Sequence, residues 1–198
     1  MKKSKIFLSI ILVVVAAFAL TACGTLDFTY VQNSDGTYTH IVKVTLTEEG
    51  VSEADVGLTL DEALNALKEG FIRKDYFVSV DGNTVTARKN FDSVQALQND
   101  LIGNGIITND VKKDENAFVV KQTISGDIKV SGKFISTNTW WFAGVLTSGG
   151  LSQTNAEKIA LKLSDADTSY TFVTPYKSTT SNADKVVETE DGNYMHVW

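Results

Sequence analysis

The feature that most limits the fold is a strict alternation of apolar and polar residues around short turns. It is clearest in residues 27–47, LDFTYVQNSDGTYTHIVKVTL, where the turn Asn33-Ser34-Asp35-Gly36 separates two strand-like segments. A period of two places successive side chains on opposite faces of a strand, so one face is apolar and the other polar. This pattern is typical of an antiparallel sheet with one buried face. In the second segment the predicted buried face holds Tyr38, His40, Val42, Val44 and Leu46.

Further hairpins are expected along the rest of the chain. Turn residues such as Gly, Asn and Asp, placed between alternating segments, are the usual signature of antiparallel hairpins. The strands expected after residue 47 are 76–80, 84–90, 117–124, 127–135, 168–176 and two segments on either side of Asp191-Gly192-Asn193.

Helical patterns lie between these hairpins. The first begins with a capping-box sequence, Thr59 with Glu62, and is expected to end at Gly70. A second helix is expected to begin with Asp92 and Gln95 as its cap and to end near residue 103.

Residues 154–163 have the spacing of a third short helix, capped by Thr154 with Glu157, although Ile159-Leu161-Leu163 also alternates as a strand would.

Hairpins with helices inserted between them define an α+β fold, with a mainly antiparallel sheet and two or three helices packed on it. The chain has 198 residues, 43% of them hydrophobic, which fits one domain with one core. No internal repeat or long linker divides residues 23–198, which we therefore treat as a single domain.

The N-terminus has the layout of a secretory signal. Three lysines precede an apolar run that starts at Ile6 and ends in Leu20-Thr21-Ala22-Cys23. Leu20 is too large for the third position before an ordinary cleavage site, whereas the order Leu–small–small–Cys resembles the bacterial lipobox. We predict that residues 1–22 are a lipoprotein signal peptide, and that Cys23, the sole cysteine, is lipidated and becomes the new N-terminus.

The alternative to cleavage is a transmembrane anchor, because residues 6–22 reach the lower edge of the length that a span needs. A diacylglyceryl cysteine carrying fatty acids such as palmitate supplies the two chains that stable membrane attachment requires. The predicted location is the extracytoplasmic face of the cell membrane. Gly24, rather than Asp, after the cysteine favours the outer membrane in an organism with two membranes.

The charge of the predicted mature chain argues against nucleic acid as a partner. Of 18 Lys and Arg residues, three lie in the first 22 residues, and the remainder faces 24 Asp and Glu residues. Affinity for nucleic acid comes largely from basic residues that neutralise phosphates. An acidic chain is also repelled by an anionic membrane surface, so membrane association must come from apolar contact or covalent lipid.

The chain carries no recognisable catalytic or cofactor motif. His40 lies on a predicted apolar face, where a hydrogen-bonded core histidine is the better interpretation, and His196 lies in the last predicted strand. Two histidines are too few for a metal site, and residues 165–176 lack the glycine and the glutamate of a calcium loop. Gly103-Asn104-Gly105 lacks the third glycine of a dinucleotide motif. We predict no catalytic residue, no metal and no cofactor, and a protein that is not an enzyme.

The most apolar part of the predicted domain is residues 138–151, NTWWFAGVLTSGGL. Trp140 and Trp141 would point to opposite faces of a strand and lie about 100° apart on a helix, so both enter a core only if it covers two sides. One interpretation is a doubly covered core segment. The other is an apolar lip at a membrane interface or over a lipid-like ligand, positions that tryptophan favours. The contact residues predicted on the second interpretation are Trp140, Trp141, Phe142, Val145 and Leu146.

Several segments together resemble the LppM-type bacterial lipoproteins. They are the lipobox cysteine, the strand–NSDG–strand opening, GNTVTARKNFDSVQAL, and the closing TFVTPYKSTTSNADKVVETEDGNYMHVW. The resemblance implies a cell-envelope lipoprotein of poorly defined activity, for which contact with lipid or glycolipid is a recurring expectation. It carries no catalytic residues over. Many relatives continue into a C-terminal membrane helix, whereas this sequence stops at Trp198, so Cys23 is the expected anchor.

The function expected from these features is a lipid-anchored, non-catalytic binding module for an apolar or amphipathic envelope component, such as a lipid or glycolipid. The alternative is a structural or accessory subunit of a membrane-associated complex, with residues 138–151 contacting a membrane protein. An envelope hydrolase that depends on His40 or His196 is the third hypothesis.

Overall fold

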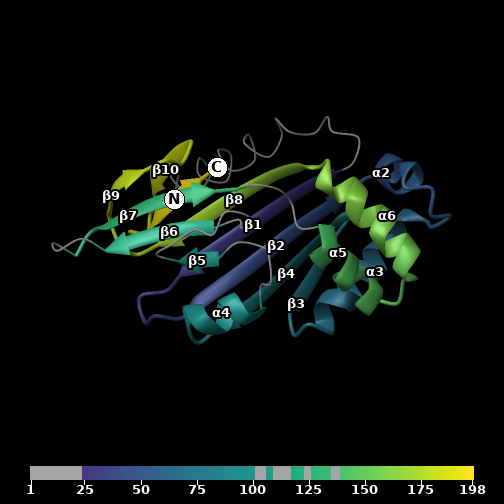
Figure 1. The fold of residues 1–198 in the computed structure, drawn as a ribbon, viewed down its shortest axis with the longest axis horizontal. Coiled ribbons are helices and arrows are strands. Elements are labelled where there is room, and N and C mark those ends of the chain that lie inside the picture. The colour runs from purple at the N-terminus through teal and green to yellow at the C-terminus, as the bar shows by residue number, and fades with distance from the viewer. Residues whose placement is uncertain (1–23, 101–105, 109–116, 123–125, 135–138) are drawn as a thin grey trace, which may run out of the picture.

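The computed structural model describes residues 24–100, 106–108, 117–122, 126–134 and 139–198, which form two sheets and a group of helices (Figure 1). The larger sheet has seven strands in the order β10-β11-β8-β1-β2-β4-β3. Its neighbouring strands are antiparallel except for β1 and β8, which are parallel. The strands are β1 (Gly24–Gln32), β2 (Tyr38–Leu46), β3 (Phe77–Asp81), β4 (Thr84–Phe91), β8 (Asp167–Thr174), β10 (Lys185–Glu188) and β11 (Tyr194–Val197).

The smaller sheet has four strands in the order β5-β6-β7-β9. Its central pair, β6 and β7, is the predicted antiparallel hairpin, while β5 and β9 join its two edges in parallel. These strands are β5 (Ile106–Thr108), β6 (Ala117–Gln122), β7 (Ile128–Lys133) and β9 (Ser178–Ser181). The helices are α2 (Glu48–Glu53), α3 (Leu60–Ile72), α4 (Val94–Asp100), α5 (Thr139–Ser148) and α6 (Gln153–Ser164).

One face of the larger sheet carries the core. Along β1 the residues Leu26, Phe28 and Tyr30 are almost fully buried, and the residues between them are only half-buried. The predicted apolar face of β2 is buried in the same way, from Tyr38 to Leu46. The alternation expected for residues 27–47 is therefore confirmed. The α+β fold with a mainly antiparallel sheet and packed helices is confirmed as well.

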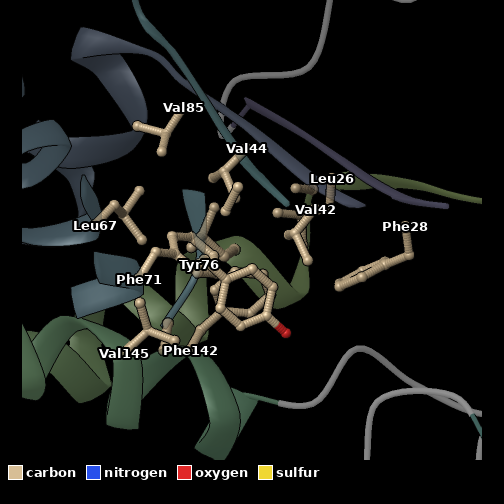
Figure 2. Close-up of a cluster of buried hydrophobic side chains, with 14 of the residues drawn as sticks. Leu26, Phe28, Val42, Val44, Leu67, Phe71, Tyr76, Val85, Phe142 and Val145 are labelled. Carbon is tan, nitrogen blue, oxygen red and sulfur yellow. The ribbon is translucent and has the colours of Figure 1, made fainter. Parts of the chain in front are cut away.

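Two different layers cover this single face. The ring of Phe142 in α5 lies 6.1 Å from that of Phe28, and the ring of Phe118 in β6 lies 5.0 Å from that of Tyr30. Because Phe28 and Tyr30 are two residues apart on β1, they point to the same side. Helices α3, α5 and α6 thus cover one end of the sheet and the smaller sheet covers the other (Figure 1). Figure 2 shows the apolar side chains that fill the space beneath the helices.

The first predicted helix is confirmed at its start and extends further at its end. Thr59 and Glu62 form the capping box, but α3 continues past Gly70 to Ile72. Gly70 faces α5, where a side-chain carbon at its position would lie 1.9 Å from the carbonyl oxygen of Val145. The glycine therefore permits close helix packing, and it does not end the helix.

The caps of the other two predicted helices also differ from expectation. The hydroxyl of Ser93 accepts a hydrogen bond from the Ala96 amide at 3.2 Å, so Ser93 replaces Asp92 as the cap of α4. Residues 153–164 form a helix, and its cap is Ser152, whose hydroxyl accepts from the Asn155 amide at 3.3 Å. Ser93 is one residue after the predicted Asp92 and Ser152 is two residues before the predicted Thr154. In both places the short serine side chain reaches the free amides of the first turn.

Candidate functional site

The tryptophan-rich stretch folds as helix α5, and its side chains divide sharply between core and solvent. Phe142, Val145 and Leu146 are fully buried. Trp141 is half-buried at the edge of this core, with ring centroids 5.6 Å from Phe71 and 4.9 Å from Phe142. Trp140 is 75% exposed. Consecutive helical residues are separated by about 100°, so Trp140 lies about 200° around the helix from Phe142. Because Phe142 faces Phe28 of the sheet, Trp140 points to the opposite side of α5.

The prediction of surface contact by Phe142, Val145 and Leu146 is wrong, because the helix turns all three toward the larger sheet. For these three residues the alternative interpretation, in which residues 138–151 are a core segment, is the one that agrees with the structure. Trp140 and part of Trp141 remain as the exposed portion of the predicted contact. Cys23, the predicted lipidation site, lies outside the described residues.

Two glycines fix the position of α5 against α3. Gly70 of α3 lies against the Val145 carbonyl, and Gly149, directly after α5, lies against the Ala66 carbonyl. At either position a side-chain carbon would come within 2.0 Å of a backbone oxygen, since the distances are 1.9 Å and 1.8 Å. Gly149, which lies within the apolar stretch 138–151, therefore packs this stretch tightly against α3. The backbone that carries Trp140 is held on the adjoining helix as a result.

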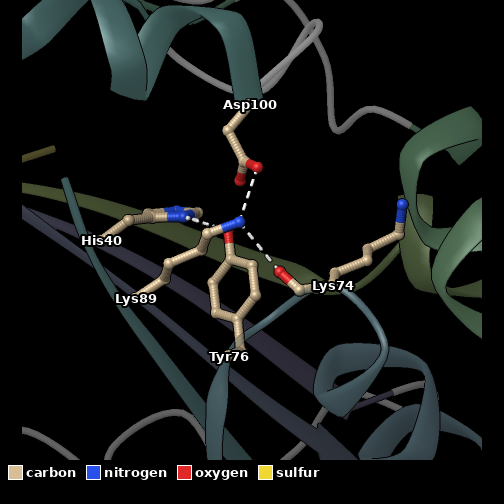
Figure 3. A network of polar contacts seen from close by, with 5 residues as sticks. All are labelled: His40, Lys74, Tyr76, Lys89 and Asp100. Carbon is tan, nitrogen blue, oxygen red and sulfur yellow. Dashed lines mark hydrogen bonds and ion pairs between the residues drawn. The ribbon is translucent and has the colours of Figure 1, made fainter.

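The second group of chemically interesting side chains surrounds His40 under the sheet (Figure 3). His40 Nδ1 lies 3.0 Å from the hydroxyl of Tyr76. The ammonium group of Lys89 donates to the Asp100 carboxylate at 2.7 Å and to the Lys74 carbonyl at 2.9 Å. It also lies 5.5 Å from the ring centroid of Tyr76. The cluster connects β2, β4, the α3–β3 connection and α4.

His40 is a hydrogen-bonded core histidine, as predicted. Burial, with a smaller contribution from the positive charge of Lys89, lowers the pKa of His40 to about 3. Burial, followed by the nearby Asp100 carboxylate, raises the pKa of Tyr76. The imidazole is therefore neutral and the phenol protonated at neutral pH. Within the described ranges His40 Nε2 is buried and has no hydrogen-bond partner, and leaving such a group unpaired costs about 1–3 kcal/mol.

The chemistry of this cluster fits a structural role. The ammonium group of Lys89 links the Lys74 carbonyl to the Asp100 carboxylate through its two hydrogen bonds. Its bond to Lys74 secures the chain just before Asp75, whose φ of 63° lies in the left-handed region. Tyr76, Lys89 and Asp100 were not singled out from the sequence. They are far apart along the chain, and no local motif links them to His40.

His196 joins the two sheets. Its Nδ1 lies 2.9 Å from the hydroxyl of Ser181 in β9, while His196 itself belongs to β11. Burial lowers the pKa of His196, and its Nε2 has no hydrogen-bond partner among the residues that the structure describes. A serine and a histidine at this distance are two members of a hydrolase triad, but the third member would have to orient the ring through this unpaired nitrogen. The contact therefore supports sheet pairing better than catalysis.

A neighbouring amide strengthens the same junction. Asn182 accepts from the Gly132 amide at 2.7 Å and donates to the Gly132 carbonyl at 2.8 Å, as a backbone peptide would. The same Asn182 oxygen accepts from the indole of Trp198 at 2.9 Å. Trp198 in turn packs on Phe118 and Phe134. The third tryptophan of the chain is thus part of the contact between the two sheets.

The described residues contain no cluster of three or more His, Cys, Asp and Glu side chains that could hold a metal ion. Asp165 is the C-cap residue of α6 and Asp167 begins β8, so the start of the 165–176 segment is a connection from helix to strand. Within the described ranges, no helix has the length and hydrophobicity needed to cross a membrane.

Among the features described above, the exposed Trp140 on a rigidly packed helix is the one that a purely structural role does not explain. Comparison of the chain with protein-family models, curated proteins and solved structures gave no match, so the resemblance to LppM-type lipoproteins stays a prediction from sequence.

Proposed function

We propose that the protein is a lipid-anchored, non-catalytic binding module of the cell envelope, which contacts an apolar or amphipathic envelope component through Trp140 on α5. The observation that carries the proposal is the 75% exposure of Trp140, on a helix whose other large apolar side chains are half-buried or buried. Tryptophan combines a large apolar surface with a polar N–H group, which suits a position between water and lipid.

The rigidity of α5 supports the same function. A contact residue on a preorganised element loses little conformational freedom on binding, so more of its contact energy is realised as affinity. Gly70 and Gly149 bring α5 into backbone contact with α3, and Phe142 fixes it to the sheet. Trp140 is therefore presented by a fixed surface.

The lipid anchor on Cys23 is proposed from the sequence. The short distance along the chain between Cys23 and the first strand supports it. Gly24, the residue directly after Cys23, is already the first residue of β1, which pairs with β2 on one side and β8 on the other. A lipid on Cys23 would therefore hold the domain at the membrane through a central strand of the larger sheet, with no linker between them. Such tethering raises the effective concentration of the domain near envelope lipids.

Fatty-acid labelling of cells that produce the full chain tests the anchor. The wild-type chain is expected to carry the label and to fractionate with membranes, while Cys23→Ala loses the label. A Cys23→Ala chain that remains in the membrane fraction, with no label on either protein, would support the transmembrane alternative.

Co-sedimentation with vesicles of extracted envelope lipids tests the contact. Residues 24–198 contain the whole described core, and we use this chain. Burying a large apolar side chain contributes about 1.5–3 kcal/mol. Trp140→Ser is therefore expected to weaken vesicle binding by roughly 10-fold or more. Val186→Ser, which removes a 45% exposed side chain on β10 at the other end of the sheet, is the matched control and should bind like the wild type.

A wild-type chain that does not bind vesicles, or a Trp140→Ser chain that binds as well as the control, would overturn this proposal. A structural or accessory subunit would then become the better hypothesis. Crosslinking from α5 in intact cells should in that case recover one dominant protein partner.

A further inference from the structure

Strand β3 is an edge of the larger sheet with little of the usual protection against pairing, since its one charged residue, Asp81, stands at its end. Natural edge strands are kept apart by Lys, Pro, bulges or short length. Among the described strands β3 pairs only with β4, in a regular five-residue register without a bulge, and it contains neither Lys nor Pro. It also exposes two large apolar side chains, Phe77 at 78% and Val80 at 45%. The opposite edge, β10, is shorter and carries Lys185 and Glu188.

The register of the β3–β4 hairpin determines which backbone groups point outward. Asp81 pairs with Thr84 across the two-residue turn Gly82-Asn83, and Gly82 has a φ of 55°. The pair that closes a hairpin of this kind exchanges both backbone hydrogen bonds, and such pairs alternate along the strands. The N–H and C=O groups of Val78 and Val80 therefore point away from β4, toward the open edge.

The sequence of β3 is suited to pairing with itself. When two identical edge strands pair antiparallel, the twofold axis is perpendicular to the sheet, and opposing residues must lie on the same face. An axis at Ser79 places Val78 opposite Val80 of a second copy, with their outward backbone groups in hydrogen-bonding position. Phe77 then lies opposite Asp81 of the second copy, and no like charges meet across the axis.

We propose that two copies of this chain associate through β3, antiparallel and centred on Ser79, so that their larger sheets form one continuous sheet. The inference does not depend on the lipid-binding proposal, because it rests on the edge alone. It is compatible with that proposal, since an axis perpendicular to the sheet leaves α5 and Trp140 of both copies on the same side.

Disulfide trapping tests the register. The chain from Gly24 to Trp198 has no cysteine, so a single introduced thiol reports on itself. Ser79 would face Ser79 of the second copy in a pair without backbone hydrogen bonds, where Cα atoms are about 4.5 Å apart and within disulfide reach. Ser79→Cys is therefore expected to form a covalent dimer under mild oxidation.

Two controls lie on the same strand. Asp81→Cys alone should stay monomeric, because its thiols would be about 13 Å apart, four residues along an extended strand. A mixture of Phe77→Cys and Asp81→Cys chains should crosslink, because these positions oppose each other in the proposed register. Equal crosslinking of Ser79→Cys and Asp81→Cys would mean random collision and would overturn the proposal.

Sedimentation velocity tests the association without a thiol. The wild-type domain is expected to reach twice the mass of one chain as concentration rises, and Val80→Pro is expected to remain at the mass of one chain. Proline removes an N–H group that points to the open edge, so the β3–β4 pairing is retained. A wild-type domain that stays monomeric, with no Ser79→Cys dimer, would contradict the inference. So would crosslinking of full-length Ser79→Cys in cells to a different protein in place of itself.

Discussion

His40 is a polar residue held in an apolar interior by one hydrogen bond and several aromatic neighbours. Its ring stacks on Tyr30 at 4.6 Å between centroids, and Nδ1 meets the Tyr76 hydroxyl. The pKa of about 3 means that the folded protein binds no proton at His40 above that pH. An unfolded chain protonates the same residue near pH 6.5. Between these two values acid therefore favours the unfolded state.

His40→Gln is expected to remove this pH dependence. Each pH unit below 6.5 should cost the wild type about 1.4 kcal/mol of unfolding free energy, down to the folded pKa. Wild type should therefore lose about 2 kcal/mol more than His40→Gln between pH 7.5 and pH 5. Urea unfolding of both proteins at the two pH values measures this difference, which cancels the contribution of the carboxylates. An identical loss in the two proteins would show that His40 is accessible to protons in the folded state.

At the scale of elements, the pairing of α3 with α5 decides how Trp140 is presented. Gly70 is in the interior of α3, where glycine is less favourable than alanine by about 1 kcal/mol. It is tolerated because its missing side chain lets the Val145 carbonyl approach. The two helices cross at a distance that larger residues would not permit.

Gly70→Ala is expected to lower the unfolding free energy by about 1–3 kcal/mol, because the overlap with Val145 outweighs the gain in helix propensity. Gly144→Ala is the matched control in α5, since a side-chain carbon there meets no atom within 4 Å. That substitution is expected to raise the unfolding free energy by up to about 1 kcal/mol. Urea denaturation of the two variants measures both values. Stabilisation by both substitutions would show that the helices are further apart than described.

The elements that could be predicted from sequence are those whose signal is local. The β1–β2 hairpin, the β3–β4 hairpin and the start of α3 each carry a turn or a cap within a few residues. Helix α5 was not assigned, because a run without polar residues has no period to read. Strand β9, SerThrThrSer in sequence, was also missed, since it forms by joining β7 in parallel across a long separation.

The candidate site was predicted in part for the same reason. The sequence singled out residues 140–146 by composition, but it could not decide which of them face solvent. That depends on the contacts of α5 with α3 and with Phe28, which are remote along the chain. The tertiary fold therefore reduces five predicted contact residues to Trp140 and the exposed part of Trp141.

At the scale of the whole molecule, the helices and the smaller sheet both pack on one face of the larger sheet. The helices cover one end and the smaller sheet covers the other, and Ser181, Asn182 and Trp198 fasten the smaller sheet in place. Trp140 projects from the helical layer on the side away from the sheet. The fold thus combines an extensive apolar interior with an exposed Trp140 on the helical layer, the residue through which we propose contact with the envelope.

Tryptophan emission from the chain Gly24 to Trp198 tests whether Trp140 on α5 contacts lipid. Subtracting the emission of a Trp140→Phe variant isolates Trp140 from Trp141 and Trp198. We expect a difference spectrum at the wavelength of solvent-exposed tryptophan, which shifts to the blue when vesicles of envelope lipid are added. A difference spectrum that is unchanged by lipid would contradict the proposed role of α5 as the lipid-contacting surface.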